Sequence, residues 1–238
     1  MSRRSIADPD VFIGELRRSR VIAILRGLDS RTTMRAVDAL RSGGLGLVEI
    51  TTDSPGWQDS VAQVARAGDD ARLEVGAGTV MTVRQAEEAC RAGATFLVSP
   101  TFVEQVAAVA RQKGIAYVPG AFTPTEIHRA QAAGAACVKV FPADTLGAGY
   151  IRRLLQPLPM LRLVPTGGVS LDTAPRYLEA GAIAVAMGGG LIDADALQAN
   201  DGTSTKTAAE QLLRRLGVEA KPHRRTHAQG GSSDVDRR

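Results

Sequence analysis

The stretch Pro124–Val140, PTEIHRAQAAGAACVKV, contains one complete helix-and-strand unit of this chain. Its first part has apolar residues at helical spacing, which predicts an amphipathic helix over Pro124–Ala133. Glycine is the usual residue just past a helix end, so Ala133-Gly134-Ala135 marks the junction. The run Ala136–Val140 that follows is short and largely apolar, which favours a buried strand.

The same unit recurs along the chain. The junction is repeated at Ala92-Gly93-Ala94 and at Ala180-Gly181-Ala182, and eight short apolar runs start 20 to 26 residues apart. A stretch of helical period lies between each run and the next. The predicted strands are Val21–Leu25, Leu47–Thr51, Leu73–Ala77, Thr95–Ser99, Ala116–Gly120, Ala136–Val140, Arg162–Thr166 and Ile183–Met187.

These strands are apolar along their length, which is typical of a parallel sheet covered on both faces. Eight of them in 238 residues predict an α/β fold of the (β/α)8 TIM barrel type, with a doubly wound open sheet as the alternative. We expect an additional helix at about Asp8–Arg18 and a last ordered helix at Ala208–Leu216. Residues 1–218 would then form a single barrel domain, and residues 219–238 a disordered tail.

The positive charge of the chain is concentrated in that tail. The formal net charge is +4, and Lys221–Arg238 has five Lys or Arg against two Asp, so the rest of the chain carries only +1. A nearly neutral body argues against a nucleic-acid-binding surface, although contact of the tail with a polyanion stays open. No stretch of about 18 apolar residues is present, so we expect a cytoplasmic protein without a membrane partner.

Histidines and cysteines are scarce. The chain has three His, and its two cysteines, Cys90 and Cys137, fall on a predicted helix and a predicted strand without metal-ligand spacing. We therefore expect two buried thiols, no metal and no other cofactor.

Lys139 is the residue that points to chemistry. Only four lysines accompany 25 arginines, and Lys139 is the one within an apolar strand. Arginine keeps its proton near neutral pH, whereas a desolvated lysine can become a neutral amine that attacks carbonyl groups. The pattern indicates an imine-forming enzyme; a lysine that extends its charged end to solvent or pairs with a carboxylate is the alternative.

Two further charged residues lie in or just after predicted strands. Glu49 is an acid within the apolar strand Leu47–Thr51, where a carboxylate is seldom left unpaired. It is either half of a buried ion pair or, together with Lys139, a general base. Arg26 closes the first strand, and its planar guanidinium suits a carboxylate substrate, although a surface arginine would look the same.

Small residues follow three of the predicted strands. Gly76-Ala77-Gly78-Thr79 allows a ligand to approach the backbone, which is also true of plain turns. Thr166-Gly167-Gly168 and Gly188-Gly189-Gly190 follow the seventh and eighth strands, and the loops at these places commonly bind phosphate in a TIM barrel.

Several of these motifs together resemble one known family. They are Val48-Glu49-Ile50-Thr51, Gly76-Ala77-Gly78-Thr79-Val80, Val98-Ser99-Pro100, Val118-Pro119-Gly120, Val138-Lys139-Val140-Phe141-Pro142-Ala143 and Pro165-Thr166-Gly167-Gly168-Val169. Between about Val21 and Leu191 the chain resembles the class I aldolases that cleave 2-dehydro-3-deoxy-6-phosphogluconate (KDPG) and 4-hydroxy-2-oxoglutarate (KHG).

The resemblance implies a role for each matching residue. Lys139 would form the Schiff base and Glu49 would act as general acid and base. The pyruvyl pocket would be lined by Thr79, Pro100 and Thr166, and the phosphate site by Gly167, Gly168, Gly188 and Gly189. The resemblance also implies a small 2-oxo acid as substrate and a homotrimer.

Two positions depart from the family pattern. Asp53 stands where KDPG aldolases commonly have an arginine, and Gly190 where they have a serine. We expect Gly190→Ser to strengthen the preference for phosphorylated substrates. The segment Ile22–Gly27 looks closer to the branch that cleaves the galactonate epimer, in which Arg26 would contact the substrate, whereas Pro165–Gly168 favours the gluconate branch.

The sequence therefore predicts a pyruvate aldolase of the KDPG type, with the galactonate epimer or another pyruvate adduct as the alternative substrate. Two other classes stay open. A phosphate-binding barrel isomerase would use the same glycine loops without Lys139, and a non-catalytic binding module would need no reactive lysine.

Overall fold

The computed structural model describes residues 8–67 and 73–218, so the predicted tail 219–238 lies outside the described residues. The strands are β1 (Val21–Leu25), β2 (Leu47–Thr51), β3 (Glu74–Gly78), β4 (Phe96–Val98), β5 (Ala116–Val118), β6 (Gly120–Ala121), β7 (Val138–Val140), β8 (Leu163–Pro165) and β9 (Val185–Met187). The helices are α1 (Pro9–Ser19), α2 (Ser30–Ser42), α3 (Trp57–Ala67), α4 (Val83–Ala92), α5 (Glu104–Lys113), α6 (Pro124–Ala132), α7 (Gly147–Leu155), α8 (Ala174–Glu179), α9 (Ala194–Gln198) and α10 (Thr203–Arg215).

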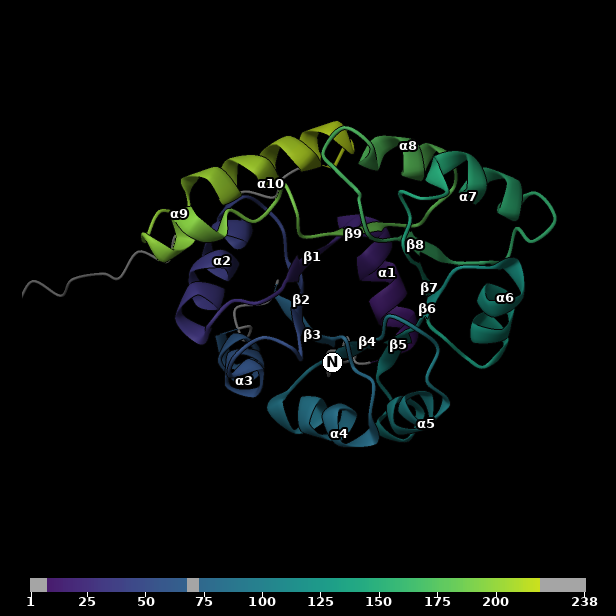
Figure 1. Ribbon diagram of the computed structural model, residues 1–238, viewed down its shortest axis with the longest axis horizontal. Coiled ribbons are helices and arrows are strands. Elements are labelled where there is room, and N and C mark those ends of the chain that lie inside the picture. Colours follow the sequence, from purple (N-terminus) through teal and green to yellow (C-terminus); the bar gives the residue numbers. More distant parts are fainter. Residues whose placement is uncertain (1–7, 68–72, 219–238) are drawn as a thin grey trace, which may run out of the picture.

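The strands form a parallel α/β fold, with helices arranged around them (Figure 1). One sheet has six strands in the order β5-β4-β3-β2-β1-β9, and a second has three in the order β6-β7-β8. The last strand, β9, is thus paired with the first, β1. Between the two sheets, Ile183 donates to the carbonyl of Leu163 at 3.0 Å, and Thr166 forms an isolated parallel bridge with Ala186.

The predicted fifth strand, Ala116–Gly120, is divided in the structure. β5 pairs with β4, Pro119 follows, and β6 then pairs with β7. Proline has no amide proton and cannot donate to a ladder, so the regular strand is interrupted there. The interruption coincides with the point at which the chain passes from one sheet to the other.

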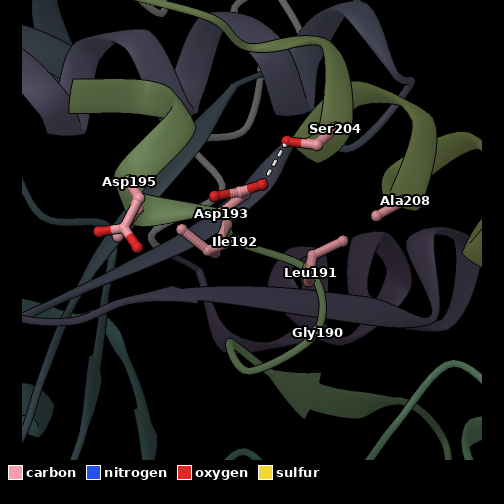
Figure 2. Close-up of a pocket in the computed structure, with 8 residues that line it drawn as sticks. Gly190, Leu191, Ile192, Asp193, Asp195, Ser204 and Ala208 are labelled. Atoms are coloured by element: carbon pink, nitrogen blue, oxygen red, sulfur yellow. Dashed lines mark hydrogen bonds between the residues drawn. The ribbon is translucent and has the colours of Figure 1, made fainter. Parts of the chain in front are cut away.

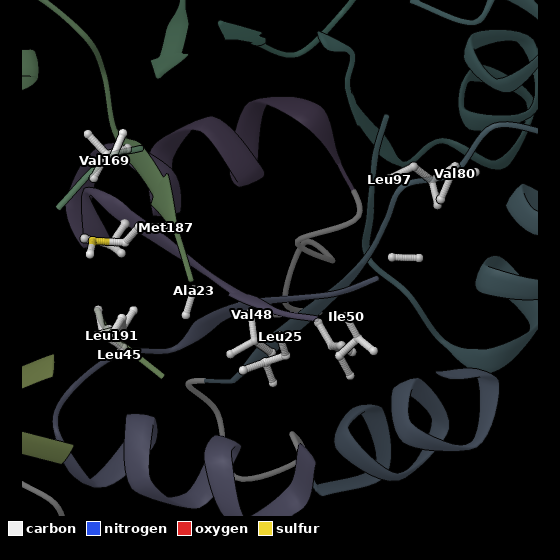
Figure 3. Packing of buried hydrophobic residues seen from close by; sticks show 14 of the residues in the cluster. Ala23, Leu25, Leu45, Val48, Ile50, Val80, Leu97, Val169, Met187 and Leu191 are labelled. Carbon is white, nitrogen blue, oxygen red and sulfur yellow. The ribbon is translucent and has the colours of Figure 1, made fainter. Parts of the chain in front are cut away.

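One face of the sheets packs against the surrounding helices. On β1 and β2, Ala23, Leu25, Val48 and Ile50 are fully buried and belong to the larger apolar cluster, which extends from β1 to Leu216, just after α10. Leu25, Val48 and Ile50 point toward the neighbouring helices (Figure 3). Side chains alternate along a strand, so the intervening residues must face the other way.

The opposite face, which we call the inner face, holds a smaller apolar cluster. Its members include Ile22 of β1, Leu47 of β2, Phe96 of β4 and Val164 of β8, together with Phe12 and Leu16 of α1. The rings of Phe12 and Phe96 lie 5.0 Å apart, a distance at which aromatic rings attract each other. Helix α1 therefore covers one end of the inner face, and Figure 1 shows it crossing the middle of the ring of helices.

Local signals in the sequence account for several helix starts. The side chain of Asp8 accepts from Asp10 N and caps α1, whose first residue is Pro9. Thr82 with Gln85, and Thr123 with Glu126, form capping boxes at α4 and α6. The prediction for α1 is close to the observed helix, whereas α10 begins at Thr203, five residues before the predicted start. Among the described residues, no helix is long and apolar enough to span a membrane.

Candidate functional site

A pocket of about 590 Å³ opens where β1, β7, β8 and β9 end. Seven of the ten residues that the sequence predicts for the site line this pocket: Arg26, Lys139, Thr166, Gly167, Gly168, Gly188 and Gly189. The other three, Glu49, Thr79 and Pro100, lie outside its lining. Glu49 is in register with Ile24, and Thr79 accepts a hydrogen bond from Arg26; Ile24 and Arg26 both line the pocket. Pro100 lies against Gly120, which is in register with Lys139.

Lys139 is the middle residue of β7 and is only 4% exposed. Its backbone is fixed by the sheet, since it is in register with Gly120 and Val164 and donates its amide to Pro119 O at 2.9 Å. Its Nζ lies 5.3 Å from the centre of the Phe141 ring. Within residues 8–67 and 73–218 it forms no ion pair. The structure thus disfavours the alternative in which Lys139 serves a salt bridge.

A thiol lies two residues before this lysine on the same face. Cys137 is fully buried in the smaller apolar cluster, and burial raises the pKa of its thiol to about 12. The thiolate is the nucleophilic form of cysteine, so Cys137 is a neutral, inert group near pH 7. Of these two residues, only Lys139 lines the pocket and remains a candidate nucleophile.

Glu49 is completely buried in β2, in register with Ile24 of β1 and Gly76 of β3. Neither of its carboxylate oxygens has a hydrogen-bond partner among the described residues. A buried polar group without a partner is costly, so each one calls for an explanation. The structure does not support the alternative of a buried ion pair for Glu49.

In three strands, a polar residue follows a residue of the smaller apolar cluster by two positions. Leu47 precedes Glu49, Cys137 precedes Lys139, and Val164 precedes Thr166, in each case by two residues. A step of two keeps a side chain on the same face of a strand. Glu49, Lys139 and Thr166 therefore all face inward, beyond the apolar cluster and toward the carboxyl ends of their strands.

Arg26 lies at the mouth of the pocket and is held by two neighbours. The Nη1 end of its guanidinium is paired with the carboxylate of Asp53, and Nη2 donates to Thr79 Oγ1 at 3.0 Å. Thr79 has a φ of 58°, which is uncommon for a β-branched residue, and its carbonyl accepts from Thr52 Oγ1 at 2.8 Å. Arg26 and Asp53 are each about half exposed, with side-chain values of 51% and 48%.

The glycine loops present backbone groups to the pocket. Among the described residues, the amides of Gly167, Gly168, Gly189 and Gly190 donate no hydrogen bond. Free amides of this kind can bind an anion. Gly188 packs on β1 so closely that an added Cβ would lie 2.7 Å from Ile24 O, and one on Gly168 would lie 2.2 Å from Asp144 Oδ2. Asp144 thus places a carboxylate beside this loop.

Pro100 lies over the strand next to Lys139. A Cβ added to Gly120 would be 1.9 Å from the carbonyl oxygen of Pro100, and Gly120 is in register with Lys139. The backbone of Pro100 therefore lies close to the level of Lys139 in the sheet.

Several features of the pocket were not assigned from the sequence. Phe141 is 38% exposed, lines the pocket and lies beside Lys139 Nζ; it follows the lysine by two residues, so strand alternation could have indicated it. Ile24 and Ser170 also line the pocket. The pairing of Asp53 with Arg26 could not be predicted from the sequence, because the two residues are on different loops.

A second pocket of about 440 Å³ adjoins the first at Gly190. It contains Asp193 and Ser204, whose side chains are hydrogen-bonded at 2.9 Å (Figure 2). Asp193 also caps α9 by accepting from Ala196 N at 3.1 Å. These contacts connect the start of α9 to α10, so Asp193 is already engaged within the fold.

Residues 8–67 and 73–218 contain no group of three or more His, Cys, Asp or Glu side chains that could hold a metal ion. Assays with and without a chelator would test the expectation that the reaction needs no metal.

Comparison with known proteins identifies relatives of this chain. The family model for KDPG and KHG aldolase matches residues 13–207. The 2-dehydro-3-deoxy-phosphogluconate aldolase of Treponema pallidum is 33% identical over 204 residues, covering 85% of this chain and 96% of the relative. The 2-dehydro-3-deoxy-6-phosphogalactonate aldolase of Escherichia coli is 33% identical over 192 residues, covering 80% and 90%.

The solved structures agree with this assignment. A 4-hydroxy-2-oxoglutarate and 2-dehydro-3-deoxyphosphogluconate aldolase superposes with a TM-score of 0.75 at 31% identity, covering 88% of this chain and 98% of that one. The protein is thus an aldolase, a carbon–carbon lyase. More particularly, the chain belongs to the KDPG and KHG aldolase family. Membership selects an aldolase over the isomerase and the binding module that the sequence left open.

Proposed function

We propose that the protein cleaves 2-dehydro-3-deoxy-6-phosphogluconate to pyruvate and glyceraldehyde 3-phosphate through an imine on Lys139. The observation that supports this most is the lysine itself, which is 4% exposed, lines the pocket and forms no ion pair within the described residues. Relatives named for this reaction and for cleavage of the galactonate epimer match over most of their length. The galactonate epimer is accordingly the alternative substrate.

In the proposed reaction the neutral amine of Lys139 attacks the C2 ketone, and the adduct loses water to give an iminium ion. The C4 hydroxyl then loses its proton as the C3–C4 bond breaks, and the bonding electrons move into the iminium to form an enamine. Glyceraldehyde 3-phosphate leaves. Protonation of the enamine at C3 and hydrolysis of the imine release pyruvate and regenerate Lys139.

Glu49 is the proposed proton carrier. It is buried, faces inward with Lys139 and has no hydrogen-bond partner among the described residues, so its carboxylate is available for a proton or a water molecule. General acid and base catalysis of this sort contributes about 10²- to 10⁴-fold in rate. Thr166, also on the inner face, and Thr79 and Pro100 at neighbouring strand ends are proposed to line the pyruvyl pocket.

The substrate is an anion, and two parts of the pocket suit its charges. Arg26 can donate to a carboxylate or a hydroxyl oxygen of the substrate. The amides of Gly167, Gly168 and Gly189, which donate to no described residue, supply donors for the phosphate, and Gly188 shapes the loop by its close approach to β1. A phosphorylated six-carbon substrate is therefore expected to be preferred over 4-hydroxy-2-oxoglutarate.

The same proposal includes the closed (β/α)8 barrel. The pairing of β9 with β1, the hydrogen bond from Ile183 to Leu163 and the bridge between Thr166 and Ala186 support closure, with β5 and β6 as one interrupted strand. Residues 1–218 would be one domain. A homotrimer and a cytoplasmic location remain proposals that rest on the family.

One set of assays tests the function. Pyruvate release is compared for the two phosphorylated epimers and 4-hydroxy-2-oxoglutarate, with and without a chelator. Borohydride reduction in the presence of pyruvate should add one three-carbon unit, which peptide mapping should assign to Lys139. Label on Lys113 or Lys206 instead, or activity that a chelator removes and Mg²⁺ restores, would refute the mechanism.

A further inference from the structure

Two glycines of β3 lie on the inner face, and each leaves a space that another side chain fills. A Cβ added to Gly76 would lie 2.3 Å from the ring of Phe96. A Cβ added to Gly78 would lie 1.9 Å from Glu49 Oε1 and 2.5 Å from both Cδ and Cγ of the same side chain. Real Cβ atoms do not approach other atoms this closely, so an alanine at either position would require the ring of Phe96 or the side chain of Glu49 to move.

The occupants of these two spaces differ in kind. Phe96 is fully buried in the smaller apolar cluster and packs against Phe12. The three atoms nearest to the added Cβ at Gly78 all belong to Glu49. Glu49 is in register with Gly76, whereas Thr51 is in register with Gly78, so the glutamate side chain leans along its strand toward the carboxyl end.

Packing is what holds the Glu49 carboxylate in place. Neither oxygen accepts a hydrogen bond from the described residues, and the residue is 0% exposed. No donor among the described residues therefore fixes the rotamer, and the position of the carboxylate depends on the space over Gly78. Proton transfer is sensitive to placement, since the donor and acceptor atoms must come within about 2.6–3.2 Å of each other, directly or through one water.

We propose that Gly78 is a positioning residue for Glu49: its missing side chain provides the space in which the glutamate reaches the reacting atoms. The proposal rests on the proton-transfer role proposed above for Glu49. It predicts that any side chain at position 78 acts on the reaction through Glu49 alone. Backbone conformation should not interfere, because the φ of Gly78 is outside the left-handed region and alanine can adopt it.

A double-mutant cycle tests this coupling. Gly78→Ala, Glu49→Ala and the double variant are compared with the parent for kcat of cleavage and for the exchange of pyruvate methyl protons with deuterium, which reports proton transfer at C3. Removing Glu49 beyond its Cβ takes away the three atoms that lie nearest to the new methyl group. Gly78→Ala should lower kcat and methyl exchange by about 10²-fold or more, yet have less than a twofold effect in the Glu49→Ala background.

Two glycine-to-alanine variants serve as controls. Gly149→Ala lies in α7 with open space around the new Cβ, so it should leave activity unchanged and should not lower stability, since alanine is the better helix former. Gly76→Ala is on the same strand and face as Gly78 but meets Phe96, so it should lower stability, and it should do so equally with and without Glu49. Imine trapping by borohydride should remain intact in Gly78→Ala, because Lys139 is on another strand.

The outcomes separate this inference from the proposed function. Equal losses from Gly78→Ala in the parent and in the Glu49→Ala background would overturn the inference and leave the aldolase mechanism standing. An unchanged kcat in Glu49→Ala would overturn the role of Glu49 and the inference with it. If Gly78→Ala does not fold, unfolding measurements on the double variant decide: stability equal to Glu49→Ala supports the coupling, and further loss refutes it.

Discussion

The two ends of the inner face differ in polarity and in how they are filled. At one end, α1 covers the strands, and Phe12 and Phe96 are fully buried. At the other end the same strands present Glu49, Lys139 and Thr166. The first end is filled and apolar. The second combines buried polar groups with a pocket of about 590 Å³.

The difference lies in how each end is stabilised. Apolar side chains at the α1 end gain free energy from burial itself, about 25 cal/mol per Å² of apolar surface. The buried carboxylate of Glu49 has no partner among the described residues, so it costs stability that the apolar end must offset. A step of two residues along a strand leads from an apolar side chain of the cluster to a polar side chain of the site. Substitutions should therefore separate into those that reduce the reaction and those that reduce stability.

The largest effect is expected at Lys139. Lys139→Arg keeps the positive charge but removes the amine, because arginine stays protonated and cannot form the imine. We expect kcat/KM to fall by more than about 10⁴-fold, as is found when a covalent nucleophile is removed. Lys113→Arg, at the exposed end of α5, is the matched control and should be fully active. A Lys139→Arg variant with a tenth of the parent activity would exclude covalent catalysis by this residue.

The α1 end should show the opposite behaviour. Phe12→Ala leaves a cavity beside Phe96, and truncation of a buried phenylalanine costs about 3–5 kcal/mol. Urea unfolding should report this loss, while kcat of the folded variant stays within a factor of about two of the parent. Ile13→Ala, on the same helix at a partly buried position, should cost less. Loss of kcat in folded Phe12→Ala would show that the two ends are coupled.

The strand and helix pattern made the fold predictable, because burial on both faces requires runs of apolar residues at regular intervals. The helix boundaries were harder to predict, because they depend on contacts between residues that are far apart in the sequence. Helix α10 starts at Thr203 although its first turn is polar, because Thr205 is fully buried and its hydroxyl accepts from Asp193 N at 3.2 Å. Ala209 of the same helix packs against Gly43, just after α2.

Within the site, residue types were predictable and pairings were not. An isolated lysine and glutamate in apolar strands are conspicuous in the sequence, and the structure brings both to the inner face. The partner of Arg26 is Asp53, 27 residues away on the loop after β2. No periodicity relates two loop residues of this kind, so the sequence identified Asp53 as a departure from the family without indicating its contact.

Asp53→Asn examines this pairing and should have a moderate effect. Removing the carboxylate leaves the charge of Arg26 uncompensated at the pocket mouth, which favours an anionic substrate. Because the pair is about half exposed, it is worth at most about 1 kcal/mol, so KM should fall by about two- to fivefold with kcat nearly constant. Added salt should reduce the gain.

The control for Asp53→Asn is Asp38→Asn, which breaks an exposed ion pair with Arg41 on α2. It should leave KM unchanged. A rise in KM for Asp53→Asn would mean that Asp53 orients Arg26 for the substrate instead of competing with it, and the sign of the change thus decides between the two roles.

The smallest effect is expected at Gly190, where two opposing terms meet. A serine there would add a hydroxyl donor for the phosphate, but the structure gives Gly190 a φ of 72°, in the region that disfavours other residues. A hydrogen bond to a charged group is worth about 1.5–3 kcal/mol, and a strained non-glycine residue costs about 1–3 kcal/mol. The two terms nearly cancel, so Gly190→Ser should change the ratio of kcat/KM between the phosphorylated and five-carbon substrates by less than about threefold.

Gly189→Ser is the sharper test, because Gly189 has open space around its Cβ position and lacks a left-handed φ, so a hydroxyl can be added there without strain. It should raise the ratio more than Gly190→Ser does and leave the unfolding midpoint unchanged. If neither serine alters the ratio and inorganic phosphate does not inhibit the parent enzyme, the loops after β8 and β9 are turns, and the substrate is bound without a phosphate contact there.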